Sequence, residues 1–129
     1  MVPKGIPMPS DLQDSLRRFK AGIFQALGHP TRVAIVEFLS HGEMSVSGLC
    51  EKVGVEQANA SQHLAVLRNK HIVETRKQGN QIFYRLRSPL LGDVLATMRD
   101  YFLAHMTEAM EMLREEKKVA KKIEQEAGR

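Results

Sequence analysis

The sequence predicts a mainly α-helical fold with one small β-hairpin, which places it in the α+β class. Over most of the chain, apolar residues recur at spacings of three and four, the periodicity of amphipathic helices. Between residues 72 and 87 the pattern changes to alternation around a Gly-Asn turn, which is typical of two antiparallel strands. Pro30 and Pro89 lie where helices are expected to begin, because proline is tolerated in a first helical turn.

The composition is that of a folded domain. The chain has 129 residues, of which 43% are hydrophobic, 26% charged and 5% aromatic. A chain of this length and balance can bury a core without disulfides or metal ions. Cys50 is the single cysteine, so an intrachain disulfide is excluded. No apolar run approaches the ~20 residues of a membrane span and the N-terminus lacks a signal-peptide core, so we expect a soluble, cytoplasmic protein.

The N-terminal part is expected to contain an irregular arm and two helices. Residues 1–9 include three prolines and form the arm. Ser10 is the expected N-cap of a helix that ends at Gly28, with Gln13 completing a capping box. Pro30 begins a second, short helix that is apolar nearly all round and is expected to lie in the core. The apolar stripe of the first helix consists of Leu12, Leu16, Phe19, Ile23 and Leu27.

Two helices joined by a tight turn follow. Ser45 caps a short helix that Gly54 closes, and only three residues separate Val53 from a helix over residues 57–69. The outer face of this second helix is unusual, because small and amide side chains stand where glutamate and lysine would serve solubility better. The outward residues are Ala58, Asn59, Ser61, Gln62 and Ala65. The inner face consists of Ala60, Leu64 and Leu67.

A hairpin and a long helix complete the chain. The expected strands cover residues 72–77 and 81–87, and the expected helix covers residues 89–106. The apolar face of this helix is longer than one small core needs, so part of it is expected to meet a second copy of the chain. Residues 107–129 form a charged helical extension or tail. The order of elements over residues 10–106 is that of a winged helix-turn-helix domain with an extra dimerisation helix at each end.

The positive charge of the chain is concentrated in one window. The net charge is +4, and residues 60–88 carry six basic side chains against one acidic side chain, whereas the segments before and after are close to neutral. Such a cluster is expected of a surface that neutralises phosphates. Charge alone is equally compatible with an idle basic surface, so the fold of the window decides between them. The basic residues are Arg68, Lys70, Arg76, Lys77, Arg85 and Arg87.

Several linked sequence motifs lie in register over about residues 15 to 105. They are ALGHPTR at 26–32 before an apolar helix, LCEKVGVEQ at 49–57, SQHL at 61–64 followed by Leu67 and Arg68, and QGNQIFYRL at 78–86. Together they closely resemble the ArsR/SmtB family of bacterial repressors, and the combination is far more specific than any one motif. His71 departs from the resemblance, because the family usually has glycine there, and we expect His71 to adopt the left-handed conformation.

The resemblance implies a homodimeric repressor whose subunits meet through helices 10–28 and 89–106. It would bind an operator palindrome in double-stranded DNA through helix 57–69 and the 72–87 wing, and an unidentified effector would release it. Amide and hydroxyl side chains can hydrogen-bond base edges, and basic wing residues can meet phosphates or the minor groove. His63 ranks below its neighbours, because it more often packs and braces the helix. The expected DNA-binding residues are Gln57, Asn59, Ser61, Gln62, His63, Arg68, Arg76, Lys77, Gln78 and Asn80.

Members of the family that sense metals or metalloids use two kinds of site, and the first is mostly absent. Ser45 and Ser47 occupy the positions that would carry the leading cysteines of an arsenite-type site, so Cys50 remains alone. A soft metalloid held by three thiolates cannot be held by one. Cys50 shares an apolar helix face with its neighbours, so packing is the first interpretation of this residue and a redox-reactive thiol is the second.

The second kind of site places a carboxylate and histidines on the last helix pair. Asp93, His105 and Glu108 preserve part of this pattern, but Leu95 stands at the second ligand position. A histidine and a glutamate three residues apart on a helix are more often a surface pair. These three residues are therefore weak metal candidates, and no cofactor is predicted.

An enzyme is not expected, because the sequence shows no nucleophile with a base, no paired carboxylates and no phosphate-binding glycine loop. The competing interpretation is a winged-helix module for protein interaction or dimerisation, since a fold does not dictate its function. The outward Asn, Ser and Gln side chains of helix 57–69 argue against this module, because protein-binding surfaces favour aromatic and aliphatic anchors.

Overall fold

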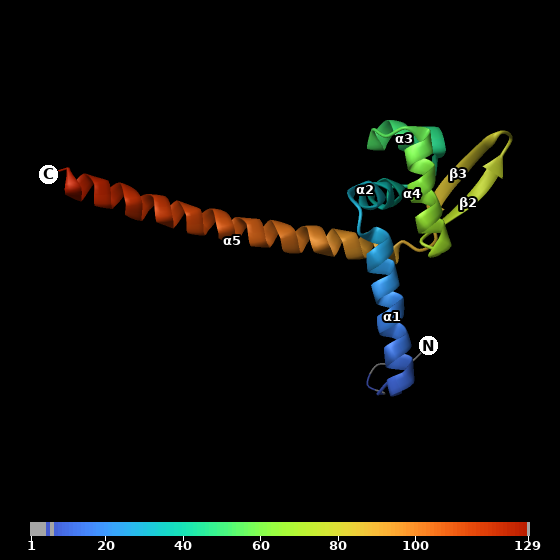
Figure 1. The fold of residues 1–129 in the computed structure, drawn as a ribbon, viewed down its shortest axis with the longest axis horizontal. Helices are drawn as coiled ribbons and strands as arrows, with labels where there is room; N and C mark the ends of the chain where they lie inside the picture. The colour runs from blue at the N-terminus through green and yellow to red at the C-terminus, as the bar shows by residue number, and fades with distance from the viewer. Residues whose placement is uncertain (1–4, 6, 129) are drawn as a thin grey trace. The chain divides into compact units, whose positions relative to one another are not determined.

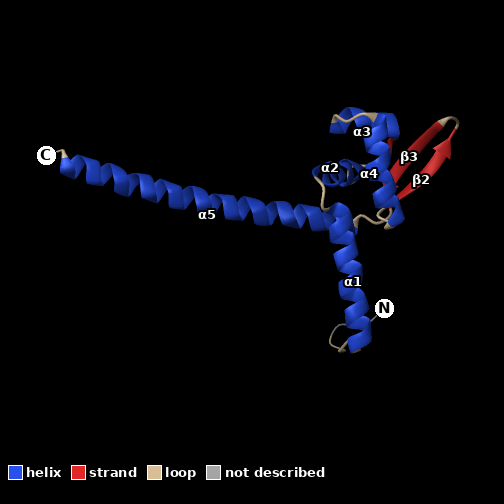
Figure 2. Cartoon of the chain, viewed as in Figure 1, coloured by secondary structure: helices blue, strands red, loops and turns tan. Residues whose placement is uncertain are grey.

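A computed structural model describes residue 5 and residues 7–128 of the chain. The predicted arm over residues 1–9 therefore lies partly outside the described residues. The chain forms two compact units, one ending at Gly92 and one beginning at Asp93. Helices dominate both units, and the strands belong to the first (Figures 1 and 2). None of the described helices combines the length and the apolar character that crossing a membrane requires.

Helix α1 (Ser10–Leu27) begins with a different N-cap from the one that the sequence predicts. The Gln13 N–H donates to the Pro9 carbonyl at 2.9 Å, which makes Pro9 the N-cap, so the expected capping box of Ser10 and Gln13 is wrong. Proline offers no side-chain acceptor, and the side chain of Gln13 instead donates to the Met8 carbonyl at 2.9 Å. Pro9 replaces Ser10 as the cap because extended backbone suits both proline and an N-cap.

The next two helices begin where their caps predict. In α2 (Pro30–Leu39), Pro30 is the first helical residue, and Nδ1 of His29 accepts a hydrogen bond from the Thr31 N–H at 3.1 Å. In α3 (Val46–Val53), Oγ of Ser45 accepts from the Gly48 N–H at 3.1 Å. Gly54 closes α3 with a φ of 80°, a left-handed conformation that glycine adopts without steric cost.

Helix α4 (Gln57–Asn69) has the bounds that the sequence predicts, and it ends in a Schellman motif. The Ile72 N–H donates to the Leu67 carbonyl, and the His71 N–H donates to the Arg68 carbonyl, each at 3.0 Å. This geometry needs a left-handed residue after the cap, and His71 supplies it with a φ of 57°. Leu67 and Ile72 are both buried, as the apolar contact of the motif requires.

The core of the first unit lies between α2, α3 and α4, which Figure 1 shows gathered together. Its most buried side chains have no solvent-accessible surface, and burying one such side chain contributes about 1.5–3 kcal/mol. They are Ile35, Val36, Leu49, Leu64 and Leu67. The predicted inner face of α4 is therefore confirmed, since Ala60 is also buried. With this face fixed inward, the remaining face of α4 points to solvent.

The sheet has one more strand than the sequence predicts. Strands β1 (Met44–Ser45), β2 (Val73–Gln78) and β3 (Gln81–Leu86) are antiparallel in the order β1-β3-β2. Two residues are too short for an alternating pattern, so β1 has no signature in the sequence. Gln78 pairs with Gln81, and Gly79 turns the hairpin with a φ of 62°.

Helix α5 (Leu90–Ala127) is continuous across the boundary that the sequence placed between residues 106 and 107. Its segment from Asp93 to Ala127 contains neither glycine nor proline and is rich in strong helix formers. The charged extension is therefore helical in the structure. At the start of the helix, Oγ of Ser88 accepts a hydrogen bond from the Leu90 N–H at 3.3 Å, in keeping with the cap predicted from Ser88 and Pro89.

Replacing the left-handed histidine by glycine should stabilise the domain. A non-glycine residue in this conformation destabilises the folded state by about 1–2 kcal/mol. Glycine removes this strain, but its greater conformational entropy in the unfolded state offsets about half of the gain. We expect His71→Gly to raise the free energy of unfolding by about 0.5–1 kcal/mol in urea denaturation. Lys70→Gly is the matched control, because Lys70 has an ordinary φ of −94°, and it should destabilise. A loss of stability in His71→Gly would contradict the prediction.

Candidate nucleic-acid interface

The outer face of α4 presents polar side chains to solvent. Gln57, Asn59, Ser61 and Gln62 are all exposed, as is Arg68 in the last turn of the helix. The side-chain amides of Gln57, Asn59 and Gln62 form no hydrogen bond with any other side chain or backbone group within residues 7–128. Their donors and acceptors are thus available to a ligand, and an amide can pair with the edge of a base in two places at once.

His63 does not share this outward orientation. Its Nδ1 lies 3.2 Å from Nη1 of Arg32, and because a guanidinium only donates, Nδ1 accepts this hydrogen bond. The ring of His63 lies 4.3 Å from the ring of His29, centroid to centroid. Nε of Arg32 also donates to the Ala26 carbonyl at the end of α1. Together these contacts brace α4 against the segment that joins α1 and α2.

The environment of His63 favours its neutral form. Burial lowers the pKa of His63 below its ordinary value, and its electrostatic interactions with His29 and Arg32 lower it further. Sequence reasoning placed His63 in the DNA-binding set and assigned no role to Arg32 or His29. The sequence did single out the segment that contains them, since Arg32 and His29 both belong to the ALGHPTR motif at 26–32.

On the wing, Arg76 is held by three partners. Its Nε donates to Oε1 of Glu43 at 2.7 Å, and its Nη1 donates to Oε1 of Gln78 at 2.8 Å. Between them the guanidinium lies over the ring of Phe83, 4.7 Å from the centroid. The hydrogen bond from Arg76 is the main reason why the pKa of Glu43 lies below its ordinary value. Sequence reasoning missed Glu43, because it lies 33 residues before Arg76.

The basic residues between positions 60 and 88 fall into two groups, those that form ion pairs and those that do not. Arg85 pairs with Glu74 at 3.0 Å, and Arg87 lies 4.0 Å from the same carboxylate. By contrast, Arg68, Lys70 and Lys77 form no ion pair within the described part of the chain. Lys77 faces away from Arg76, since successive side chains of a strand alternate. The uncompensated positive charge therefore lies at the C-terminal end of α4 and on β2, with exposed Asn80 at the hairpin turn.

The sensing candidates do not converge. Oγ of Ser45 lies 3.2 Å from Oγ of Ser47, and Cys50 is half-buried on α3, so an arsenite-type site with three thiolates does not fit these residues. Asp93 and His105 are twelve residues apart on α5, or about 18 Å along its axis, too far to share one ion in a single chain. Nowhere in the described ranges do three His, Cys, Asp or Glu residues gather to hold a metal.

Comparison with known proteins matches this fold and sequence to bacterial regulators. The family profile described as "Bacterial regulatory protein, arsR family" matches residues 29–75. An HTH-type transcriptional regulator of Mycobacterium tuberculosis is 38% identical over 87 residues, covering 67% of this chain and 76% of that protein. A biofilm growth-associated repressor of Xylella fastidiosa is 38% identical over 89 residues, covering 69% of this chain and 78% of that protein.

Solved structures show the same architecture. The crystal structure of the Mycobacterium tuberculosis regulator aligns with a TM-score of 0.67 at 34% identity, covering 74% of this chain and 96% of that one. The solution structure of a homodimeric winged helix-turn-helix DNA-binding domain from Mycobacterium bovis aligns with a TM-score of 0.66 at 26% identity, covering 78% of this chain and 95% of that one. The predicted fold class, mainly α with a winged helix-turn-helix, is confirmed.

The His63 brace should make the stability of the domain depend on pH. Because folding lowers the pKa of His63 from 6.5, the folded state binds this proton less readily than the unfolded state. The stability contributed by neutral His63 is therefore complete above pH 6.5 and is lost as the pH falls below it. Urea denaturation at pH 7.5 and 5.5 should show a smaller loss in His63→Gln than in the unmodified chain. His41→Gln, in an exposed turn, is the control, and equal losses in all three proteins would refute the assignment.

Proposed function

This chain belongs to the ArsR family of bacterial winged helix-turn-helix transcriptional regulators, and from this premise we propose that it represses transcription by binding an operator through α4 and the β2–β3 hairpin. Proteins of this family bind DNA and are not enzymes. The observation that carries the proposal is the outer face of α4, where the amide groups have no side-chain partner among the described residues and lie near basic side chains that form no ion pair with those residues. Such a face suits base edges and phosphates at the same time.

Helix α4 and the β2–β3 hairpin would make different contacts with DNA. Asn59 and Gln62 on α4 can each form two hydrogen bonds with an adenine in the major groove, and the hydroxyl of Ser61 can donate or accept beside them. Arg68 and Lys77 supply charge for phosphates, which sets affinity and position but carries no sequence information. Gln57 and Asn80 flank these contacts, and Glu43 and Gln78 hold Arg76 in place on the wing. His63 would position α4 and leave base reading to its neighbours.

A homodimer would present two such surfaces to the two halves of a palindrome. On α1, Phe19 and Phe24 are exposed by 64% and 55%, and on α5, Met98 and Phe102 are also more than half exposed. Large apolar side chains in these numbers favour a protein partner. We propose that helices 10–28 and 89–106 form the dimer interface, that the dimer acts in the cytoplasm, and that an effector of unknown chemistry releases it from DNA. Asp93, His105 and Glu108 remain weak candidates for metal binding, and Cys50 remains a candidate redox thiol.

Removing one base-reading amide should lower specificity more than affinity for random DNA. We expect Gln62→Ala to reduce the preference for the duplex upstream of its own gene over a scrambled duplex by about 5- to 150-fold, corresponding to 1–3 kcal/mol. Fluorescence anisotropy titrations with both duplexes measure the ratio, and Gln125→Ala, an exposed amide of α5 outside the proposed interface, is the control. An unchanged ratio would reject base reading by Gln62. Weak binding without preference by a folded dimer of the unmodified chain would favour a protein-interaction module instead.

Removing the wing lysine should weaken binding to every sequence alike. Each phosphate contact adds about one unit to the slope of log K against log salt concentration, because a bound cation releases about one counterion. We therefore expect Lys77→Ala to make this slope shallower by about one for both duplexes. Lys121→Ala, a charge change on α5, should leave the slope unaltered. A slope in Lys77→Ala equal to that of the unmodified chain would count against contact between the wing and DNA.

A further inference from the structure

The two faces of the β2–β3 hairpin carry different side chains. The strand register places Lys77 opposite Ile82, and the next pair toward the core is Arg76 opposite Phe83. Successive side chains of a strand point to opposite sides, so the two pairs lie on opposite faces of the hairpin. We call the face with Lys77 and Ile82 the Lys77 face, and the face with Arg76 and Phe83 the Arg76 face.

Carboxylates neutralise cations on the Arg76 face. Glu43 pairs with Arg76 at 2.6 Å. On the same face, Glu74 pairs with Arg85 at 3.0 Å, and the two are also directly opposed in the strand register. A phosphate that approached this face would meet both negative charges. Lys77, by contrast, forms no ion pair with any residue in the described part of the chain, so its charge is available to an anionic ligand.

Ile82 gives the Lys77 face an exposed apolar group as well. It is 46% exposed, whereas the other large apolar residues of the three strands are buried or half-buried. Directly opposed residues of antiparallel strands have Cβ atoms about 4.5–5.5 Å apart, so the side chains of Lys77 and Ile82 emerge side by side. The pair lies next to the hairpin turn, at the end of the wing that extends away from α2, α3 and α4 (Figure 1).

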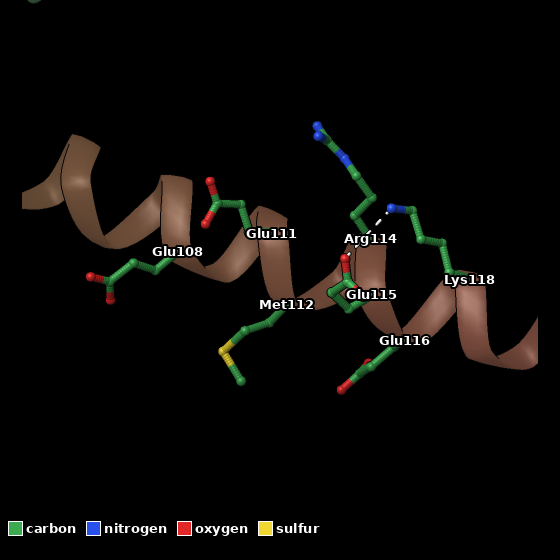
Figure 3. A pocket seen from close by; sticks show the side chains of 7 residues that line it. All are labelled: Glu108, Glu111, Met112, Arg114, Glu115, Glu116 and Lys118. Carbon is green, nitrogen blue, oxygen red and sulfur yellow. Dashed lines mark ion pairs between the residues drawn. The ribbon is translucent and has the colours of Figure 1, made fainter.

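The charged surface of α5 does not combine these two features in the same way. Figure 3 shows Arg114 and Lys118 among several glutamates, and Lys118 pairs with Glu115 at 3.6 Å. The hollow drawn there is lined by residues of α5 alone, so it is open helix surface and does not enclose a ligand. Such a surface of mixed charge favours a phosphate less than the Lys77 face does.

The backbone of DNA alternates the two kinds of group that the Lys77 face can contact. Each strand carries about one phosphate per 3.4 Å of helix axis, and a deoxyribose with an apolar C–H edge lies between successive phosphates. A lysine side chain reaches farther than an isoleucine side chain. The ammonium group can therefore contact a phosphate while the isoleucine packs against the adjacent sugar, and neither contact depends on the base sequence.

We propose that the hairpin meets DNA with its Lys77 face, and that Ile82 packs against a deoxyribose beside the phosphate that Lys77 contacts. The inference rests on the proposed function and adds Ile82 to the residues that position the wing. Packing on a sugar removes apolar surface from water and displaces no counterion. Ile82 thus contributes affinity that does not depend on salt, whereas Lys77 contributes affinity that does.

Lysine substitutions on the two faces test which face meets DNA. Ile82→Lys adds a cation to the Lys77 face, and Gln81→Lys adds one to the Arg76 face at the neighbouring position. We expect Ile82→Lys to steepen the slope of log K against log salt concentration by about one, and Gln81→Lys to leave it unaltered. Equal slopes in the two variants, or a steeper slope in Gln81→Lys, would overturn the proposed orientation of the wing.

A second substitution tests the contact with the sugar. Ile82→Thr keeps a β-branched side chain that suits a strand but removes much of the apolar surface. We expect affinity for the native and the scrambled duplex to fall alike, by about three- to tenfold, with an unchanged salt slope, because about half of an isoleucine side chain loses its contact. Unchanged affinity would exclude the contact, and a fall confined to the native duplex would place Ile82 against a base instead.

The measurements separate this inference from the proposed function. Suppose that the unmodified chain prefers its own upstream duplex and that Lys77→Ala makes the salt slope shallower, but that Ile82→Thr binds as tightly as the unmodified chain. The wing then contacts DNA as proposed, and only the contact of Ile82 fails. If the unmodified chain binds neither duplex, the proposed function and this inference fail together. Urea denaturation of each variant confirms that the compared proteins are folded.

Discussion

Burial of one face of α4 is the constraint on which the rest of the first unit depends. Ala60, Leu64 and Leu67 are enclosed by α2, α3 and the hairpin, and rotating the helix would expose leucine side chains that now have no accessible surface. Each such exposure costs about 1.5–3 kcal/mol. Because this face is fixed, the amides of Asn59 and Gln62 project from the opposite face of α4 into solvent.

Polar contacts between segments that are distant in sequence fix side-chain positions that burial of apolar residues does not determine. Arg32 joins the end of α1 to His63, and this contact requires an imidazole that accepts and is therefore uncharged. Glu43, the residue before β1, pairs with Arg76 on β2. Both guanidiniums are positioned by partners, whereas the Lys77 side chain forms no ion pair with any residue that the structure describes. The domain thus combines oriented groups with an exposed cation at the periphery.

Local patterns predicted the helices, the inner face of α4 and the hairpin, because capping residues and periodicity act over a few neighbouring positions. The same patterns could not reveal β1, since two residues have no periodicity, or the pairing of Glu43 with Arg76 across 33 residues. The cap at Pro9 was missed because Ser10 offers a better side chain, yet backbone geometry determined the start of α1. The division after residue 106 was based on a change in charge, and α5 runs on across it because helix propensity does not change there.

The ion pair between Glu43 and Arg76 bears on how quickly such a protein scans a chromosome. A carboxylate already occupies the guanidinium, so a phosphate of arbitrary sequence has to displace it before the arginine adds to the contact. If the wing contacts DNA as proposed, fewer condensed cations would be released at each chance encounter, and the protein would spend less time on DNA that it does not recognise. Short dwell times on the vast excess of irrelevant sites leave more of the population searching. In the proposed mode of binding, an acidic residue in a basic wing would thereby shorten the time needed to reach an operator.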